Sequence, residues 1–271
     1  RTAQGTVCSP PPSSALPDRV GHPMGACCCC PGRDGSADSE GLLGLATLFG
    51  GSPPWSALIW LHGLGDTETN WRNRITEGVL PRLSSACGHC HLLTPRAPVA
   101  YVTCNFGVPM TCWFDMKRLP LDAESSPPEY GCSLAGAKHS AKRIHDLIDE
   151  LSHAGVPPER IAIGGFSQGG AMALLSAMLY PEALACCVCF SGILLGSDRL
   201  QGLISPSNRR LKVLWCHGTK DDVLRQSLQR AGCEALEAAG IEVRQRQYPV
   251  GHQASDGALV EMAAFLGEHM R

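Results

Sequence analysis

Apolar and polar residues follow a regular order from residue 57 to the end of the chain. Short apolar runs alternate with segments of about ten to fifteen residues in which apolar positions recur at steps of three and four, as on one face of a helix. The clearest helical face holds Ala141, Ile144, Ile148 and Leu151. We expect strands at ALIWLHG, HLLTPRAPV, IAIGGFS, ALACCVCFSG, LKVLWCHG and EVRQRQYP.

This alternation predicts an α/β fold. Helices are expected at GGAMALLSAML, which stops at Tyr180-Pro181, around residues 226–239, and from about Asp256 onward. Strands that alternate with helices imply a mostly parallel sheet with helices on both faces, and continuous apolar strands fit burial on both sides. In such sheets the ligand site lies beyond the carboxyl ends of the strands.

The segment before this pattern has a different character. Residues 1–54 are rich in Pro, Gly, Ser and Cys and show neither helical nor strand periodicity. Such a composition buries little apolar surface, so we expect a disordered leader at 1–54 and a folded domain at 55–271. Within the leader, GLLGLATLFG at 41–50 is too short to span a bilayer and fits an early edge strand or part of a targeting peptide.

The leader also contains the cysteine-rich segment MGACCCCPG at 24–32. With Met24 as initiator, Gly25 and the cysteines that follow would resemble a dual-acylation signal that tethers the chain to a membrane. The position that usually carries Ser or Thr is Cys29, which weakens the match. A cysteine-rich disordered tail is the simpler interpretation, and membrane tethering is the alternative.

Composition excludes some classes of function. The chain is 44% hydrophobic and 18% charged, which is an ordinary composition for a globular protein. Its net charge is −2, so a nucleic-acid partner is not expected. No apolar stretch approaches the roughly 18 residues of a membrane span. Several of the 15 cysteines fall in the predicted strand ALACCVCFSG, where free cysteine acts as a small apolar residue. We therefore expect a reducing, cytoplasmic location.

Polar residues stand directly after the predicted strands. Ser167 follows IAIGGF, Asp221 and Asp222 follow LKVLWCHG, and His252 follows the last strand. A serine, an acid and a histidine in this chain order are typical of the nucleophile-elbow arrangement, and all three should emerge at one edge of the sheet.

The serine lies in a G-x-S-x-G motif made by Gly165, Ser167 and Gly169. The motif alone is weak, and an ordinary glycine-rich turn is the alternative. A strand before it and a helix after it fit a sharp turn, in which the two glycines are needed because neighbouring backbone approaches closely. The strain is tolerated because it directs the serine oxygen into the cleft.

A serine hydroxyl needs a base within hydrogen-bond reach, and His252 is the candidate because imidazole titrates near neutral pH. A buried carboxylate on its other nitrogen would fix the tautomer, and we choose Asp221 over Asp222 for this role. The alternatives are a surface histidine and two solvated loop acids. Backbone N–H groups of Gln168, at the helix start, and of Leu64, after the first strand, are placed to stabilise an oxyanion.

Six motifs carry a resemblance to a known family. LHGLGDT, PRAPV, WFDM, GGFSQGGAM, HGTKDD and GH occur in the order and approximate spacing of the acyl-protein thioesterase and lysophospholipase-like carboxylesterase family, from about residue 55 to the end. The resemblance implies a compact α/β-hydrolase fold, no cofactor, and cleavage of thioesters and oxygen esters of long acyl chains on proteins or lysolipids, or of smaller esters.

The resemblance also implies roles for single residues. Ser167 resembles the family's nucleophile, His252 its base and Asp221 its acid, while Leu64 and Gln168 resemble its oxyanion donors. The acid loop departs from the family's His-Gly-Asp-x-Asp-Pro pattern, because Thr219 stands at the first Asp position and Asp222 at the Pro position. The register of the acid is therefore less firmly fixed than that of the serine.

Four further positions have two interpretations each. Trp113 and Phe114, in the long connection at 108–116, either fill the core or form an apolar wall for an acyl chain. His62 and His217 are candidates for catalysis, but we expect His62 to hold the oxyanion loop and His217 to be structural.

The segment CGHCH at 87–91 matches the covalent haem pattern, and Cys87, His89, Cys90 and His91 could also surround zinc. It leads straight into a predicted core strand and no second Cys/His pair with zinc-finger spacing follows, so we expect neither metal nor haem.

These observations predict a serine hydrolase that forms an acyl-Ser167 intermediate. An acyl-protein thioesterase acting on acylated proteins, with transient membrane association, is the first expectation. A lysophospholipase or small-ester carboxylesterase is the alternative, and the oligomeric state is left open. A non-catalytic binding protein on the same fold would need a defective triad, and the sequence shows none.

Overall fold

The computed structural model describes residues 56–87, 89–124 and 131–270. The predicted leader at 1–54 lies outside the described residues, together with its cysteine-rich segment and the candidate strand at 41–50. In the part of the chain that the structure describes, no helix is both long and apolar enough to cross a bilayer.

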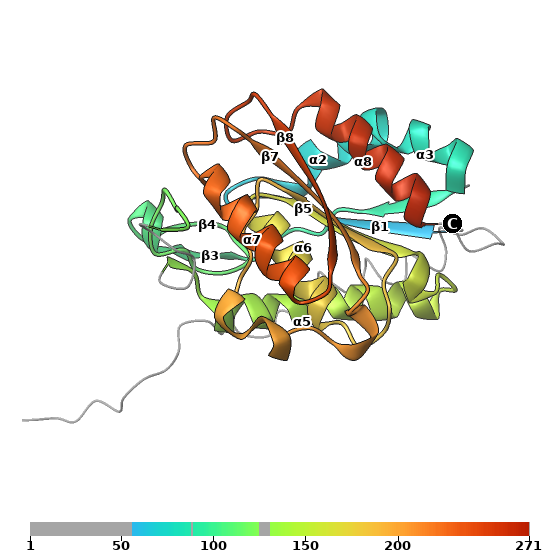
Figure 1. Ribbon diagram of the computed structural model, residues 1–271, viewed down its shortest axis with the longest axis horizontal. Helices are drawn as coiled ribbons and strands as arrows, with labels where there is room; N and C mark the ends of the chain where they lie inside the picture. Colours follow the sequence, from blue (N-terminus) through green and yellow to red (C-terminus); the bar gives the residue numbers. More distant parts are fainter. Residues whose placement is uncertain (1–55, 88, 125–130, 271) are drawn as a thin grey trace, which may run out of the picture. The chain divides into compact units, whose positions relative to one another are not determined.

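A six-stranded parallel sheet forms the centre of the fold (Figure 1). Its spatial order is β2-β1-β5-β6-β7-β8. The strands are β1 (Ser56–Leu61), β2 (Cys90–Leu93), β5 (Ile161–Phe166), β6 (Cys186–Phe190), β7 (Lys212–Gly218) and β8 (Glu242–Tyr248). All six overlap the predicted runs, with β1 and β2 each beginning one residue earlier than predicted, and the predicted parallel sheet is confirmed.

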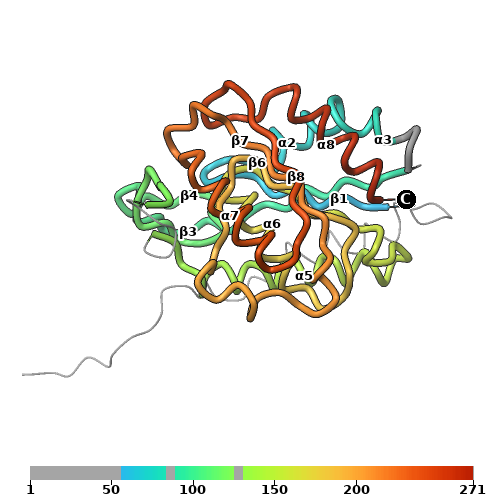
Figure 2. The backbone as a smooth tube through the Cα atoms, in the orientation of Figure 1, coloured from blue at the N-terminus to red at the C-terminus, as the bar shows by residue number. Residues whose placement is uncertain are grey.

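Helices cover both faces of this sheet (Figures 1 and 2). One face carries α5 (Leu134–His153), α6 (Gln168–Leu179) and α7 (Gln226–Ala238), and the other carries α2 (Glu68–Gly78), α3 (Leu80–Cys87) and α8 (Asp256–His269). The alternation of side chains along β5 divides the core accordingly: Ile161 and Ile163 pack on the first set, while Ala162 packs on the second. Short 3₁₀ turns occupy Thr103–Asn105, Pro158–Arg160, Ser197–Gly202 and Pro206–Asn208.

Serine side chains fix the start of two helices. Ser133 accepts a hydrogen bond from the N–H of Gly136 at the start of α5, and Ser255 accepts one from Ala258 at the start of α8. Each bond engages a backbone N–H of the first helical turn, where the regular helical hydrogen bonds are missing.

The connection after β2 contains an antiparallel hairpin that the sequence did not indicate. β3 (Val99–Val102) pairs with β4 (Val108–Thr111), so the first part of the segment at 108–116 is a strand. The hairpin exposes apolar side chains: of the six large hydrophobic residues that are exposed in the described chain, four lie here, namely Val99, Tyr101, Phe106 and Val108.

Candidate active site

Ser167 occupies a strained turn between β5 and α6. Its backbone has φ +56° and ψ −120°, outside the conformations that L-residues normally adopt. The main-chain N–H of Ser167 donates to the carbonyl of Phe190, the last residue of the neighbouring strand β6. The turn is therefore fixed to the sheet, which is how such strain is sustained.

The two glycines of the motif are required by close backbone contacts. A Cβ atom on Gly165 would lie 2.3 Å from the carbonyl of Gly169, and a Cβ atom on Gly169 would lie 2.1 Å from the carbonyl oxygen of Leu61. Any side chain at either position would overlap the backbone, so the predicted reason for these glycines is confirmed.

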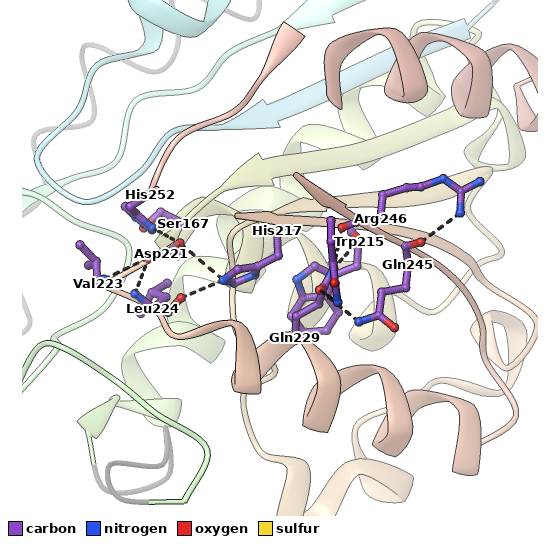
Figure 3. Close-up of polar contacts among 11 residues, drawn as sticks. Ser167, Trp215, His217, Asp221, Val223, Leu224, Gln229, Gln245, Arg246 and His252 are labelled. Atoms are coloured by element: carbon purple, nitrogen blue, oxygen red, sulfur yellow. Dashed lines mark hydrogen bonds and ion pairs between the residues drawn. The ribbon is translucent and has the colours of Figure 1, made fainter. Parts of the chain in front are cut away.

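The structure brings the predicted serine, histidine and aspartate together (Figure 3). The Oγ of Ser167 lies 2.8 Å from Nε2 of His252, and Nδ1 of His252 lies 2.7 Å from Oδ2 of Asp221. They come from the end of β5, the loop after β8 and the loop after β7, so the carboxyl ends of three parallel strands meet at this edge.

Asp221 and Asp222 have different surroundings. Asp221 is buried, and its Oδ1 accepts hydrogen bonds from the N–H groups of Val223 and Leu224, whereas Asp222 is exposed. Burial by itself raises the pKa of Asp221, but the hydrogen bonds and charge of its partners outweigh burial, and the pKa is lowered. Asp221 is thus an ionised acceptor at neutral pH, which places the proton of His252 on Nδ1 and leaves Nε2 free to accept from Ser167.

The two proposed oxyanion donors flank the serine. Gln168 is the first residue of α6, and Leu64 lies in the loop that follows β1. A Cβ atom on Gly63 would lie 3.4 Å from Cβ of Ser167, so this loop passes beside the serine. The loop is held by a hydrogen bond from the N–H of Gly65 to the carbonyl of Thr111 at 2.8 Å.

The buried side chain of His62 holds this loop by hydrogen bonds. The ring is buried; Nε2 accepts from the N–H of Ala97 at 3.0 Å, and Nδ1 therefore donates to the carbonyl of Gly63 at 2.8 Å. Burial lowers the pKa of His62, so the ring is neutral at pH 7. The contacts agree with the expectation that His62 holds the loop.

His217 lies behind Asp221. It is buried, its Nε2 donates to the carbonyl of Leu224 at 2.8 Å, and the same nitrogen lies 3.4 Å from Oδ2 of Asp221. Burial lowers the pKa of His217 as well. This arrangement fixes the acid loop, as expected of a structural residue.

Trp113 and Phe114 are both buried in the main core cluster. The side chain of Gln168 holds their backbone, because Oε1 accepts from the N–H of Trp113 and Nε2 donates to the carbonyl of Phe114, both at 2.8 Å. The indole N–H of Trp113 donates to the carbonyl of His62 at 2.9 Å. Burial and these bonds favour the core interpretation over the acyl wall. The side-chain role of Gln168 was not foreseen, because it depends on a partner 55 positions away.

In the CGHCH segment, Cys87 is the last residue of α3, and Cys90 and His91 begin β2. His89 is exposed, Cys90 is buried in β2 and His91 is half-buried. Among the residues for which side chains are described, a group that excludes Cys87, no three His, Cys, Asp or Glu side chains are arranged to hold a metal ion.

Comparisons with known proteins agree with the resemblance. The family model described as Phospholipase/Carboxylesterase matches residues 46–270. A probable carboxylesterase of Oryza sativa subsp. japonica is 33% identical over 220 residues, which are 80% of this chain and 78% of that protein. Acyl-protein thioesterase 1 of Gibberella zeae is 33% identical over 218 residues, 79% of this chain and 91% of that protein. The crystal structure of SOBER1 from Arabidopsis thaliana superposes with a TM-score of 0.71 at 30% identity, covering 80% of this chain and 99% of that one.

Proposed function

Because the chain belongs to the phospholipase/carboxylesterase family of α/β-hydrolases, we propose that it is a serine hydrolase that cleaves esters and thioesters through an acyl-Ser167 intermediate. Membership supports a hydrolase of the carboxylesterase and thioesterase type. The observation that carries the serine mechanism is the continuous hydrogen-bond chain from Ser167 through His252 to Asp221, with links of 2.8 and 2.7 Å.

Acylation follows from this geometry. As Ser167 Oγ attacks the carbonyl carbon of the substrate, its proton moves to Nε2 of His252, and Asp221 stabilises the resulting imidazolium. The N–H groups of Leu64 and Gln168 donate to the oxyanion of the tetrahedral intermediate. The bond to the thiol or alcohol leaving group then breaks, the leaving group takes the proton from Nε2, and the acyl group remains on Oγ.

Deacylation reverses these roles with water as the nucleophile. His252 takes a proton from water, the hydroxide attacks the acyl carbon, and the oxyanion is again held by the two backbone donors. When the ester bond to Ser167 breaks, Nε2 returns the proton to Oγ. A carboxylic acid is released and the free enzyme is restored.

For the substrate, long acyl chains on proteins, in thioester linkage, are the first choice. Two observations support it: a relative named acyl-protein thioesterase, and the exposed apolar hairpin β3–β4, which is tied to the loop of Leu64 by the bond between Gly65 and Thr111. Acylated proteins and lysolipids both occur at membrane surfaces, with which the enzyme would associate transiently. Lysophospholipid or small-ester hydrolysis is the second candidate, supported by the relatives named carboxylesterase.

An active-site probe tests the serine mechanism. A fluorophosphonate should label the protein, and Ser167→Ala should abolish labelling. Ser191→Ala is the matched control, because Ser191 also follows a buried central strand and also has positive φ (45°). Labelling that survives Ser167→Ala would refute the assignment.

A second experiment tests the substrate class. Phe106 is 98% exposed and Tyr101 is 73% exposed, so replacing both by serine should leave the fold intact. We expect the double variant to raise KM for a palmitoyl thioester by roughly three- to tenfold, the value of partly burying two aromatic side chains, and to leave acetyl thioester hydrolysis unchanged. Equal effects on both substrates, or none, would contradict a role of the hairpin in long-chain recognition.

A further inference from the structure

Helix α2 contacts both loops that the proposed chemistry requires. It begins directly after the loop that carries Leu64, and its side chains reach the loop that carries His252. The triad itself does not use this helix. Three separate interactions, made through Asp66, Trp71 and Arg74, connect it to the site.

The first connection is a series of tilted ring contacts that ends on His252. The imidazole of His252 lies 5.0 Å from the ring of Phe166, with 44° between the planes, and Phe166 lies 5.3 Å from the indole of Trp71, at 34°. Trp71 is buried and also packs on Trp60 of β1 at 5.0 Å. Phe166 is thus fixed on one side by a buried indole and contacts the imidazole on the other.

The second connection is a tether to the backbone beyond the histidine. Nη2 of Arg74 donates to the carbonyl of Ala254 at 2.9 Å, and its guanidinium lies 5.2 Å from the centre of the Trp71 ring. Ala254 is two residues past His252. The arginine therefore holds the histidine loop while it packs on the same indole that supports Phe166.

The third connection is made to the oxyanion loop. The indole N–H of Trp71 donates to Oδ2 of Asp66 at 3.0 Å, and Oδ1 of Asp66 accepts from the N–H of Thr67 and from Asn70. The backbone carbonyl of Asp66 accepts from the hydroxyl of Thr111 at 2.7 Å. Asp66 is two residues past Leu64, so the loop of the proposed donor is anchored to the same indole.

We propose that α2 is a brace that fixes the base relative to the oxyanion donor, with Phe166, Trp71 and Arg74 as positioning residues. The proposal rests on the serine mechanism above. Acylation needs Nε2 of His252 and the N–H of Leu64 to be correctly placed at the same moment, and misplacement of either group slows the chemical step. The indole of Trp71 bonds to Asp66 in the oxyanion loop and packs on Phe166 and Arg74, which contact the histidine loop, and so provides that common reference.

Arg74 is the most informative residue to mutate in a test of the brace, because its side chain is exposed and its removal leaves the core intact. Losing a charge-assisted hydrogen bond at the surface should slow acylation about three- to tenfold in Arg74→Ala, with KM unchanged. Arg74→Lys keeps a cationic donor and should recover most of the rate. Arg72→Ala is the matched control, because Arg72 is exposed on the same helix and bonds instead to Thr94.

The readouts separate positioning from stability. The rate of fluorophosphonate labelling measures activation of Ser167, the far-downfield proton resonance of the His252 Nδ1–H measures the Asp221 hydrogen bond, and thermal melting measures the fold. Arg74→Ala should slow labelling and broaden the resonance without lowering the melting temperature. Phe166→Leu should also slow labelling and broaden the resonance. Unchanged labelling and resonance in both variants, or equal losses in Arg72→Ala, would overturn the brace. Failure of the serine mechanism would instead appear as labelling of Ser167→Ala.

Discussion

The side-chain oxygen of Gln168 accepts a hydrogen bond from the backbone N–H of Trp113 at 2.8 Å, while its amide nitrogen donates to the next carbonyl, that of Phe114. The residue after the nucleophile therefore has two roles: its backbone N–H is a proposed oxyanion donor, and its buried side chain fixes the segment that packs against His62.

Gln168→Ala should destabilise the protein strongly. It leaves a buried N–H and a buried carbonyl without partners, at a cost of about 1–3 kcal/mol each. Urea denaturation would measure the change in the free energy of unfolding. Gln201→Ala, at an exposed position, is the control and should have little effect. Equal stability of Gln168→Ala and wild type would show that the two hydrogen bonds of the Gln168 side chain do not stabilise the fold.

Gly169→Ala should prevent the native turn from forming. The added methyl group would lie 2.1 Å from the carbonyl oxygen of Leu61, which belongs to a central strand and has no room to move. We expect loss of soluble protein or of all fluorophosphonate labelling. Gly202→Ala serves for comparison, because a Cβ atom there meets nothing within 4 Å. A soluble, labelled Gly169→Ala protein would contradict the geometry of the elbow.

Asp221→Asn and Asp222→Asn should differ sharply in turnover. Oδ1 of Asp221 accepts two backbone N–H groups, so an asparagine would keep its oxygen there and turn its NH₂ group toward Nδ1 of His252. The histidine would then be forced into the wrong tautomer, and kcat should fall about 10⁴-fold. Asp222→Asn should leave kcat unchanged because Asp222 is exposed. The reverse result would move the acid by one position.

Stability should fall as the pH drops below the ordinary histidine pKa. Burial lowers the pKa of His62 and of His217, so below about pH 6.5 the unfolded chain takes up protons that the folded protein does not. Each group can then contribute a slope of at most about 1.4 kcal/mol per pH unit. Denaturation at pH 7.5, 6.5 and 5.5 would measure it. His217→Asn, which keeps a donor for Leu224, should show a shallower slope, and parallel curves would contradict the prediction.

The sheet could be predicted because burial on both faces makes its strands continuous apolar runs, as in IAIGGF of β5. The helix α2 could not, since only Trp71 and Ile75 of its 11 residues are buried and this stripe is too narrow to give a helical period. The β3–β4 hairpin was missed for a related reason: both strands are mostly exposed, so burial imposes no alternation on them.

In the site, too, some residues could be predicted from the sequence and others could not. Ser167, Asp221 and His252 could be predicted because each follows a strand that the pattern reveals, and the topology alone brings such positions to one edge. The roles of Phe166 and Arg74 depend on contacts with His252 and Ala254, which lie far along the chain, and the local sequence does not reveal these contacts. The one available signal is the alternation along β5, which directs Phe166 toward the face that α2 covers.

Five cysteines of β6, β7 and α7 are buried in the interior of the protein. Their burial raises the pKa of every one of these thiols, and they are Cys186, Cys187, Cys189, Cys216 and Cys233. A thioester gives up its acyl group readily to a thiolate, and a thiol that stays protonated and out of reach cannot compete for it. In the thioesterase that we propose, these five thiols are therefore kept from taking up the acyl group of the substrate.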